Sequence, residues 1–170
     1  SDLDIFPFFS YQFDEVNSNQ LAFLSQNHPY SADLGKIVGK HKGAFYYTIG
    51  QRKGLGIGGY DEPLLIIGTD TQVNNIYVGK GENHPGLNRP ALFISKEETH
   101  WIRTDLELQE GNKKIMLVRI RYRQALEKAC LYQTAEGLYI VFENLQRGIA
   151  PGQFAAWYDG EELIGSGVIN

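Results

Sequence analysis

The residues best suited to chemistry lie in one segment, residues 39 to 60, with the sequence GKHKGAFYYTIGQRKGLGIGGY. The segment combines basic, aromatic and glycine residues: Lys40, Lys42, Arg52 and Lys53; Phe45, Tyr46 and Tyr47; Gly50, Gly54, Gly56, Gly58 and Gly59. No acidic residue occurs between Asp33 and Asp61. Cationic groups neutralise phosphate, and glycine lets the backbone approach a ligand closely. The composition indicates a phosphate-rich partner, and it fits equally a solvated glycine loop beside a short core helix.

A second basic pattern places an arginine at every other position: Arg119, Arg121 and Arg123. In a strand, side chains two positions apart share a face and stand ~6.6 Å apart. We therefore expect the three arginines to form a ridge on one strand face, towards solvent. Such a ridge can follow a phosphate backbone, or it can pair with acids such as Glu127 or Glu143.

Other chemical patterns in the sequence are not supported by their surroundings. Residues 54 to 59 match the dinucleotide-binding pattern G-x-G-x-x-G, but that pattern needs a strand before it and a helix after it. Here QRK precedes it and YDEP follows it. We expect no catalytic residue and no metal site, because the four histidines are scattered and Cys130 has no partner at ligand spacing. Cys130 is expected to be a buried strand residue.

The bulk properties limit where such contacts occur. A chain of 170 residues holds one domain or two small ones. Its net charge of −4 means that any contact with nucleic acid comes from a local patch. The single cysteine excludes an internal disulfide and fits a reducing cytosol. No apolar run approaches the ~20 residues of a membrane span, so we expect a cytoplasmic location without membrane association.

The elements that position these residues are expected to be mainly β. Residues 64–69 and 75–79 are typical of paired strands, and residues 81–90 have the composition of a linker. Six further strand-like runs follow: residues 91–101, 113–123, 127–134, 137–143, 153–158 and 162–169. We predict a small mixed central domain, residues 1–90, followed by a six-stranded antiparallel β-barrel, residues 91–170.

Local signals add detail at both ends of the chain. Pro151 and Gly152 predict a type II turn that presents Gln153 at the start of the next strand. Asn17 or Ser18 is expected to cap a short helix over residues 20–26. The apolar residues before it are expected to pack on the rest of the protein: Ile5, Phe6, Phe8, Phe9, Tyr11 and Phe13.

Several motifs in order resemble the bacterial tRNA-specific 2-thiouridylases, which install sulfur at the wobble uridine. They are HKGAFYYTIGQRKGLGIGG, GENHPGL, THWI, RIRYRQ and APGQFAAWYDGEELIGSGVI, and the resemblance covers residues 36 to 170. It implies that tRNA is the partner and that three residues in the last two motifs contact it: Arg121, Tyr122 and Gln153. It also suggests an RNA-facing role for Gln51, Arg52 and Lys53.

The resemblance also identifies what this chain lacks. Members of the family use ATP, bound by an SGGxDS-type loop, and pass sulfur through two cysteines. Neither that loop nor a cysteine before Cys130 occurs here. Either the chain begins downstream of the chemistry or its parent departs from the two-cysteine scheme.

We therefore expect a tRNA-docking fragment of an enzyme that 2-thiolates the wobble uridine of tRNA. The fragment would need no cofactor, while ATP and a sulfur-relay donor protein would serve the parent enzyme. The alternative is a protein-interaction β-barrel that does not bind RNA.

Overall fold

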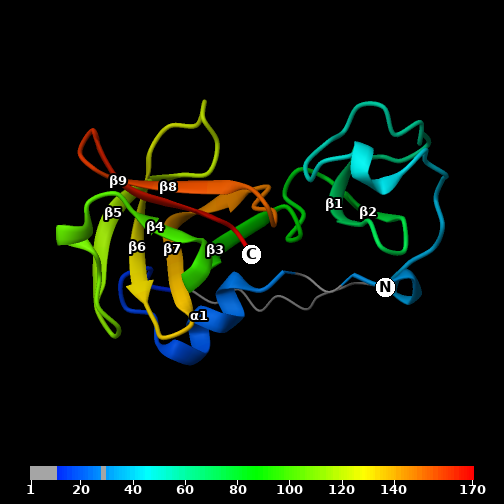
Figure 1. Cartoon of the computed structure of the whole chain (residues 1–170). Helices are drawn as coiled ribbons and strands as arrows, with labels where there is room; N and C mark the ends of the chain where they lie inside the picture. Colours follow the sequence, from blue (N-terminus) through cyan, green and yellow to red (C-terminus); the bar gives the residue numbers. More distant parts are fainter. Residues whose placement is uncertain (1–10, 28–29) are drawn as a thin grey trace. The chain divides into compact units, whose positions relative to one another are not determined.

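The computed structural model describes residues 11–27 and 30–170, and its regular elements are mostly strands, which confirms the mainly β prediction. The chain divides into two compact units (Figure 1). One unit is Asn27–Asn88, and the other combines the described residues 11–26 with Arg89–Asn170. The division at residue 88 falls beside the predicted boundary at residue 90. Residues 11–26, which the prediction assigned to the central domain, group instead with the barrel.

The central unit is built on one antiparallel hairpin. Strand β1 (Leu64–Asp70) pairs with β2 (Asn75–Lys80), as the sequence predicted. Leu65, Ile67 and Leu87 form its buried core. Two 3-10 turns precede the hairpin, η1 (Ala32–Leu34) and η2 (Ala44–Tyr46), and the second lies within the basic segment, residues 39 to 60.

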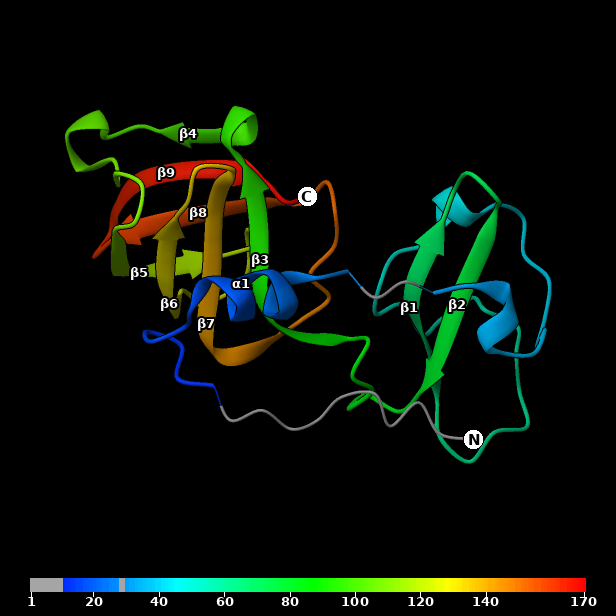
Figure 2. The same cartoon turned by 90° about the horizontal axis from the view of Figure 1, so that it is seen from below.

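The other unit is a curled, seven-stranded sheet that forms a half-barrel (Figures 1 and 2). The strand order is β3-β7-β6-β5-β8-β9-β4. The strands are β3 (Asn88–Ser95), β4 (Thr99–Trp101), β5 (Lys113–Arg119), β6 (Glu127–Gln133), β7 (Gly137–Arg147), β8 (Phe154–Asp159) and β9 (Glu162–Val168). β5 pairs antiparallel with both β6 and β8, and β9 pairs antiparallel with β8 and β4.

The sheet has one strand more than the six predicted. The run over residues 91–101 is broken by the 3-10 turn η3 (Lys96–Glu98), which separates β3 from β4. These two strands lie at opposite edges of the sheet. The last residue connects the first edge to the end of β9. The Asn170 backbone N–H donates to the Phe93 carbonyl at 3.0 Å, and its side-chain oxygen accepts from the Ser95 N–H at 3.0 Å.

The concave side of the sheet encloses the larger core. Trp157 on β8 lies at its centre, fully buried, with its ring in edge-to-face contact with Trp101. A Cβ atom at Gly165, directly across from Trp157 on β9, would lie 2.6 Å from the indole. Only glycine therefore fits at residue 165 under this ring. The core also contains Leu92, Ile94, Met116, Val118, Leu131, Leu138, Ile140, Phe142 and Ile164.

The N-terminal segment packs on the convex side of the sheet (Figure 2). Helix α1 (Ser18–Ser25) is capped by Asn17, whose side chain accepts from the Gln20 N–H, as the capping signal predicted. The Tyr132 hydroxyl fixes the residues before the helix, since it donates to the Phe13 carbonyl and accepts from the Val16 N–H.

The expected packing of the apolar N-terminal residues is confirmed where they are described. Tyr11 and Phe13 lie partly buried against this cluster. The predictions for Ile5, Phe6, Phe8 and Phe9 fall outside the described residues.

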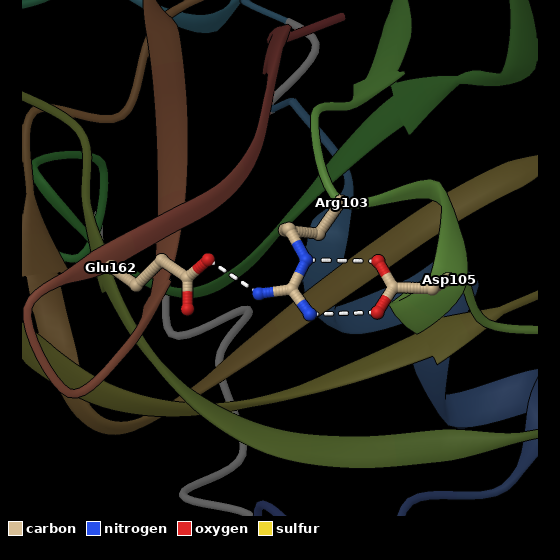
Figure 3. Close-up of polar contacts among 3 residues, drawn as sticks. All are labelled: Arg103, Asp105 and Glu162. Atoms are coloured by element: carbon tan, nitrogen blue, oxygen red, sulfur yellow. Dashed lines mark hydrogen bonds and ion pairs between the residues drawn. The ribbon is translucent and has the colours of Figure 1, made fainter.

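An exposed ion-pair cluster fastens the connection between β4 and β5 to the β8–β9 hairpin (Figure 3). Arg103 donates from Nε and Nη2 to the two carboxylate oxygens of Asp105 at 2.8 and 2.7 Å, and from Nη1 to Glu162 at 2.5 Å. The hydrogen bonds from Arg103 lower the pKa of Asp105. The guanidinium is thus occupied by two carboxylates.

Within the described residues, no helix is long and apolar enough to cross a membrane.

Candidate nucleic-acid interface

The three-arginine strand ridge is contradicted by the structure. β5 ends at Arg119, and residues 121–124 form a turn closed by the bond from the Gln124 N–H to the Arg121 carbonyl at 3.1 Å. The Gln124 side-chain oxygen also accepts from the Ile120 N–H at 3.0 Å. Because this side chain replaces the neighbouring strand as hydrogen-bond partner, the alternation stops there. Arg121 and Arg123 are exposed on a loop, not aligned with Arg119 on a strand face.

Arg119 has a different role, because it supports the neighbouring aromatic rings. Its guanidinium donates to the Tyr158 hydroxyl at 2.9 Å and to the Tyr122 carbonyl at 3.3 Å. It also lies over both rings, 5.7 Å from the Tyr122 centroid and 5.1 Å from that of Tyr158. Tyr122 is nevertheless 87% exposed. Arg119 thus holds Tyr122 in place while most of that side chain faces solvent.

Arg121 and Gln153 belong to two loops that are bonded together. Arg121 Nη2 donates to the Gly148 carbonyl at 3.1 Å. Gly148 opens the connection that leads to Gln153, so the Arg121 side chain reaches the segment that carries the second motif. A further bond joins the same two segments, since Gln124 Nε2 donates to Gln146 Oε1 at 2.6 Å. Two segments distant in sequence, residues 121–124 and residues 148–153, therefore lie together at one end of the sheet, which we call the rim.

The turn before Gln153 forms as the sequence predicted. The Gln153 N–H donates to the Ala150 carbonyl at 3.3 Å, and Gly152 has a φ of 87°, as the third position of a type II turn requires. The Gln153 side chain bends back, and its oxygen accepts from the Ala150 N–H at 3.3 Å.

Two residues of this rim were missed by sequence reasoning. Phe154, which follows Gln153 directly at the start of β8, is 68% exposed. An exposed phenylalanine at a strand start carries no distinct sequence signal. Arg89 lies beneath the rim, 5% exposed, and donates to the carbonyls of Ser25 and Ile149. Nothing in the sequence indicated this role, because Arg89 lies in residues 81–90, whose composition indicated only a linker.

The basic segment of the central unit is a loop whose shape depends on Gln51. The side-chain oxygen of Gln51 accepts from the Thr48 N–H at 3.2 Å, and its Nε2 donates to the Lys53 carbonyl at 2.9 Å. The side chain of Gln51 thus bonds within its own loop. Arg52 and Lys53 are exposed. Their exposure leaves both cations available to an anionic partner.

A polar open groove runs beside this loop, lined by Arg52 and residues 54–64. Gly54, Gly56 and Gly59 line it with positive φ, which suits glycine. The element that follows is strand β1, not a helix. The dinucleotide reading of these glycines is therefore correctly rejected.

The predicted site residues fall into two groups. Arg121, Tyr122 and Gln153 belong to the barrel unit, and Gln51, Arg52 and Lys53 belong to the central unit. Cys130 lies on β6, 1% exposed, which confirms the expectation for this residue, and burial raises the pKa of its thiol. Among the residues that the structure describes, no group of three or more His, Cys, Asp or Glu side chains is arranged to hold a metal ion.

Comparison with known families assigns both units. Residues 25–80 match the tRNA methyl transferase PRC-barrel domain, and residues 93–169 match the aminomethyltransferase beta-barrel domain. The fold and the two matches define the chain as the central and C-terminal domains of a class of tRNA-modifying proteins.

Similar curated proteins identify the family. The tRNA-specific 2-thiouridylase MnmA of Flavobacterium johnsoniae is 51% identical over 89% of this chain and 38% of its own length. The proteins of that name from Christiangramia forsetii and Karelsulcia muelleri are 48% and 43% identical, over 95% and 92% of this chain. The chain belongs to the tRNA-specific 2-thiouridylase family. It spans between 38% and 42% of the length of these relatives.

Proposed function

We propose that this chain is the tRNA-docking part of an enzyme that 2-thiolates the wobble uridine of tRNA. The observation that supports the proposal is the bond from Arg121 to the Gly148 carbonyl, which joins the turn carrying Arg121 and Tyr122 to the connection that leads to Gln153. Each of the three presents a group suited to RNA: a cation for phosphate, an aromatic face for a base, and an amide for a base edge or the 2′-hydroxyl. The resemblance to the family implies the same role for these three positions.

The chemistry of the parent enzyme is proposed to reside in the part of the family's sequence that this chain does not span. ATP would activate the uridine there, and a sulfur-relay donor protein would supply the sulfur. The single cysteine of this chain supports the proposal that the sulfur chemistry resides elsewhere in the parent enzyme. Cys130 is buried, and its raised pKa leaves little thiolate to act as a nucleophile or to carry a persulfide. The enzyme is expected to act in the cytoplasm.

The experiment measures tRNA binding by fluorescence anisotropy from 50 to 300 mM salt. The protein carries a net charge of −4, so non-specific attraction is weak and binding must come from local cations. We expect saturable binding with an affinity that falls log-linearly with salt, by about 0.7 to 0.9 log units per log unit of salt for each phosphate contacted. In the presence of ATP and tRNA, we expect neither AMP release nor thiolated tRNA.

Two results would overturn the proposal. Release of AMP that depends on tRNA would show that this chain carries the chemistry itself. Absence of tRNA binding at low salt would leave the protein-interaction β-barrel as the better account. A heat-unfolded sample and a DNA hairpin of equal phosphate number serve as controls.

A further inference from the structure

We propose that Phe45 and Tyr46, on the 3-10 turn of the central unit, form a stacking platform for an unpaired nucleobase. This inference rests on the proposed function, because it assumes that the chain binds tRNA. It adds a second contact surface, in the other unit of the chain, and it specifies the form of RNA which that surface takes: a base outside a duplex.

The two rings form an exposed aromatic surface. Their centroids are 4.0 Å apart with an interplanar angle of 35°, so the rings support each other. Phe45 is nevertheless 70% exposed and Tyr46 is 67% exposed. A pair of large rings in solvent is unusual for a surface without a partner, because each buries far less apolar area than it could.

The backbone beneath the rings is fixed from several sides. The Ala44 N–H donates to the Asn74 side-chain oxygen at 2.8 Å, and Asn74 itself has a φ of 57°. The Gly43 N–H donates to His41 Nδ1 at 3.1 Å. A Cβ atom at Gly43 would lie 3.1 Å from the Phe45 ring and 3.2 Å from the Tyr46 ring, so both rings fold over this glycine. The platform is therefore held in place before any ligand arrives, which lowers the entropic cost of binding.

The charge around the platform favours a polyanion. Residues 34–60, which carry the rings, contain no acid and five lysine or arginine residues: Lys36, Lys40, Lys42, Arg52 and Lys53. All five are exposed, and no ion pair engages any of them in the described part of the chain. An acidic protein could also use these cations, but exposed rings among unpaired cations match the chemistry of single-stranded nucleic acid, where a base stacks while its phosphates are neutralised. In a duplex the base faces are already covered, so the platform has nothing to stack on.

The test compares two RNA probes with equal numbers of phosphates. One is a 12-nucleotide single strand with a central 2-aminopurine, and the other is a blunt-ended duplex without unpaired bases. The variant is Phe45→Leu with Tyr46→Leu, which keeps apolar side chains but removes both π faces. Because both residues are exposed and the turn is held by backbone bonds, we expect the variant to fold, as checked by thermal unfolding. Ile37→Ala, at a residue 93% exposed in the same unit, is the matched control for loss of an apolar side chain.

We expect the wild type to quench the 2-aminopurine. The double variant should lose this quenching and bind the single strand at least about fivefold more weakly. Affinity for the duplex should be unchanged, and Ile37→Ala should behave as the wild type with both probes. Equal binding of the single strand by the double variant overturns the inference and leaves the rings as a protein-docking surface. An equal loss for both probes also overturns it, because the contact would then not distinguish unpaired bases. The proposed function fails separately, if the wild type does not bind tRNA.

Discussion

Replacing Arg121 with alanine should weaken tRNA binding without unfolding the barrel. The side chain is exposed, and among the described residues its one hydrogen bond runs from Nη2 to the Gly148 carbonyl at 3.1 Å. The remaining guanidinium donors are available to a phosphate. We expect Arg121→Ala to cost about 1 kcal/mol or more of binding free energy, which is at least about fivefold in Kd.

The salt dependence gives a second, independent magnitude. Removing one cation that contacts one phosphate should reduce the slope of log K against log salt by about 0.7 to 0.9. The free energy of unfolding should fall by about 0.5 to 1.5 kcal/mol, the net value of one hydrogen bond, because water can reach the exposed loop. Binding and unfolding are measured by anisotropy and by urea denaturation of the same preparation.

Arg103→Ala is the matched control, because it makes the same change in net charge. Arg103 is occupied by Asp105 and Glu162, and Glu162 begins β9 at the end of the β8–β9 hairpin remote from Gln153. Six residues of β8 separate the two ends, about 20 Å at the rise of a strand. We expect Arg103→Ala to lower stability slightly and to leave the salt slope unchanged. The reasoning is refuted if both variants weaken binding equally, or if Arg121→Ala binds tRNA as the wild type does.

Three further predictions concern stability. Burial lowers the pKa of His84, whose Nδ1 accepts from the Gly86 N–H. The unfolded chain therefore binds more protons, so stability is complete above about pH 6.5 and falls as the pH drops through the folded pKa; equal melting temperatures at pH 7.5 and 5 would contradict this. Tyr132→Phe should cost about 1 to 3 kcal/mol and speed proteolysis within residues 11–26, since the buried Val16 N–H loses its acceptor; unchanged proteolysis would argue against it. Cys130→Ser should reduce stability modestly and leave tRNA affinity unchanged, and rapid thiol labelling of the native wild type would be inconsistent with its burial.

Local sequence signals predicted much of the fold. The hairpin of the central unit follows from two short apolar runs separated by turn residues, and β1 and β2 match those runs closely. Asn17 caps helix α1 and Gly152 takes the positive φ of a type II turn, as predicted. Both structures depend on interactions within four consecutive residues. Signals of this kind need no knowledge of the rest of the chain.

The errors arose where a side chain or a distant contact decides the structure. Arginine alternation suggested that β5 continues to residue 123, but the Gln124 side chain takes the Ile120 N–H and closes a turn. The packing of residues 11–26 on the barrel depends on bonds across more than 100 positions, such as that from Tyr132 to Phe13. Arg89 gained its buried role in the same way, from carbonyl groups distant in sequence. None of these contacts produces a periodic pattern in the sequence from which it could be predicted.

The central claim is that the rim of the barrel docks tRNA, and backbone amide chemical shifts during a titration with unmodified tRNA test it most directly. We predict that the largest changes in the barrel unit cluster at Arg121, Tyr122 and Gln153, and that they diminish together as salt is raised. Residues of the remote ion-pair cluster, Arg103 and Glu162, should remain unchanged. Saturable tRNA binding whose shifts lie elsewhere in the barrel unit, with this rim unperturbed, would contradict the account.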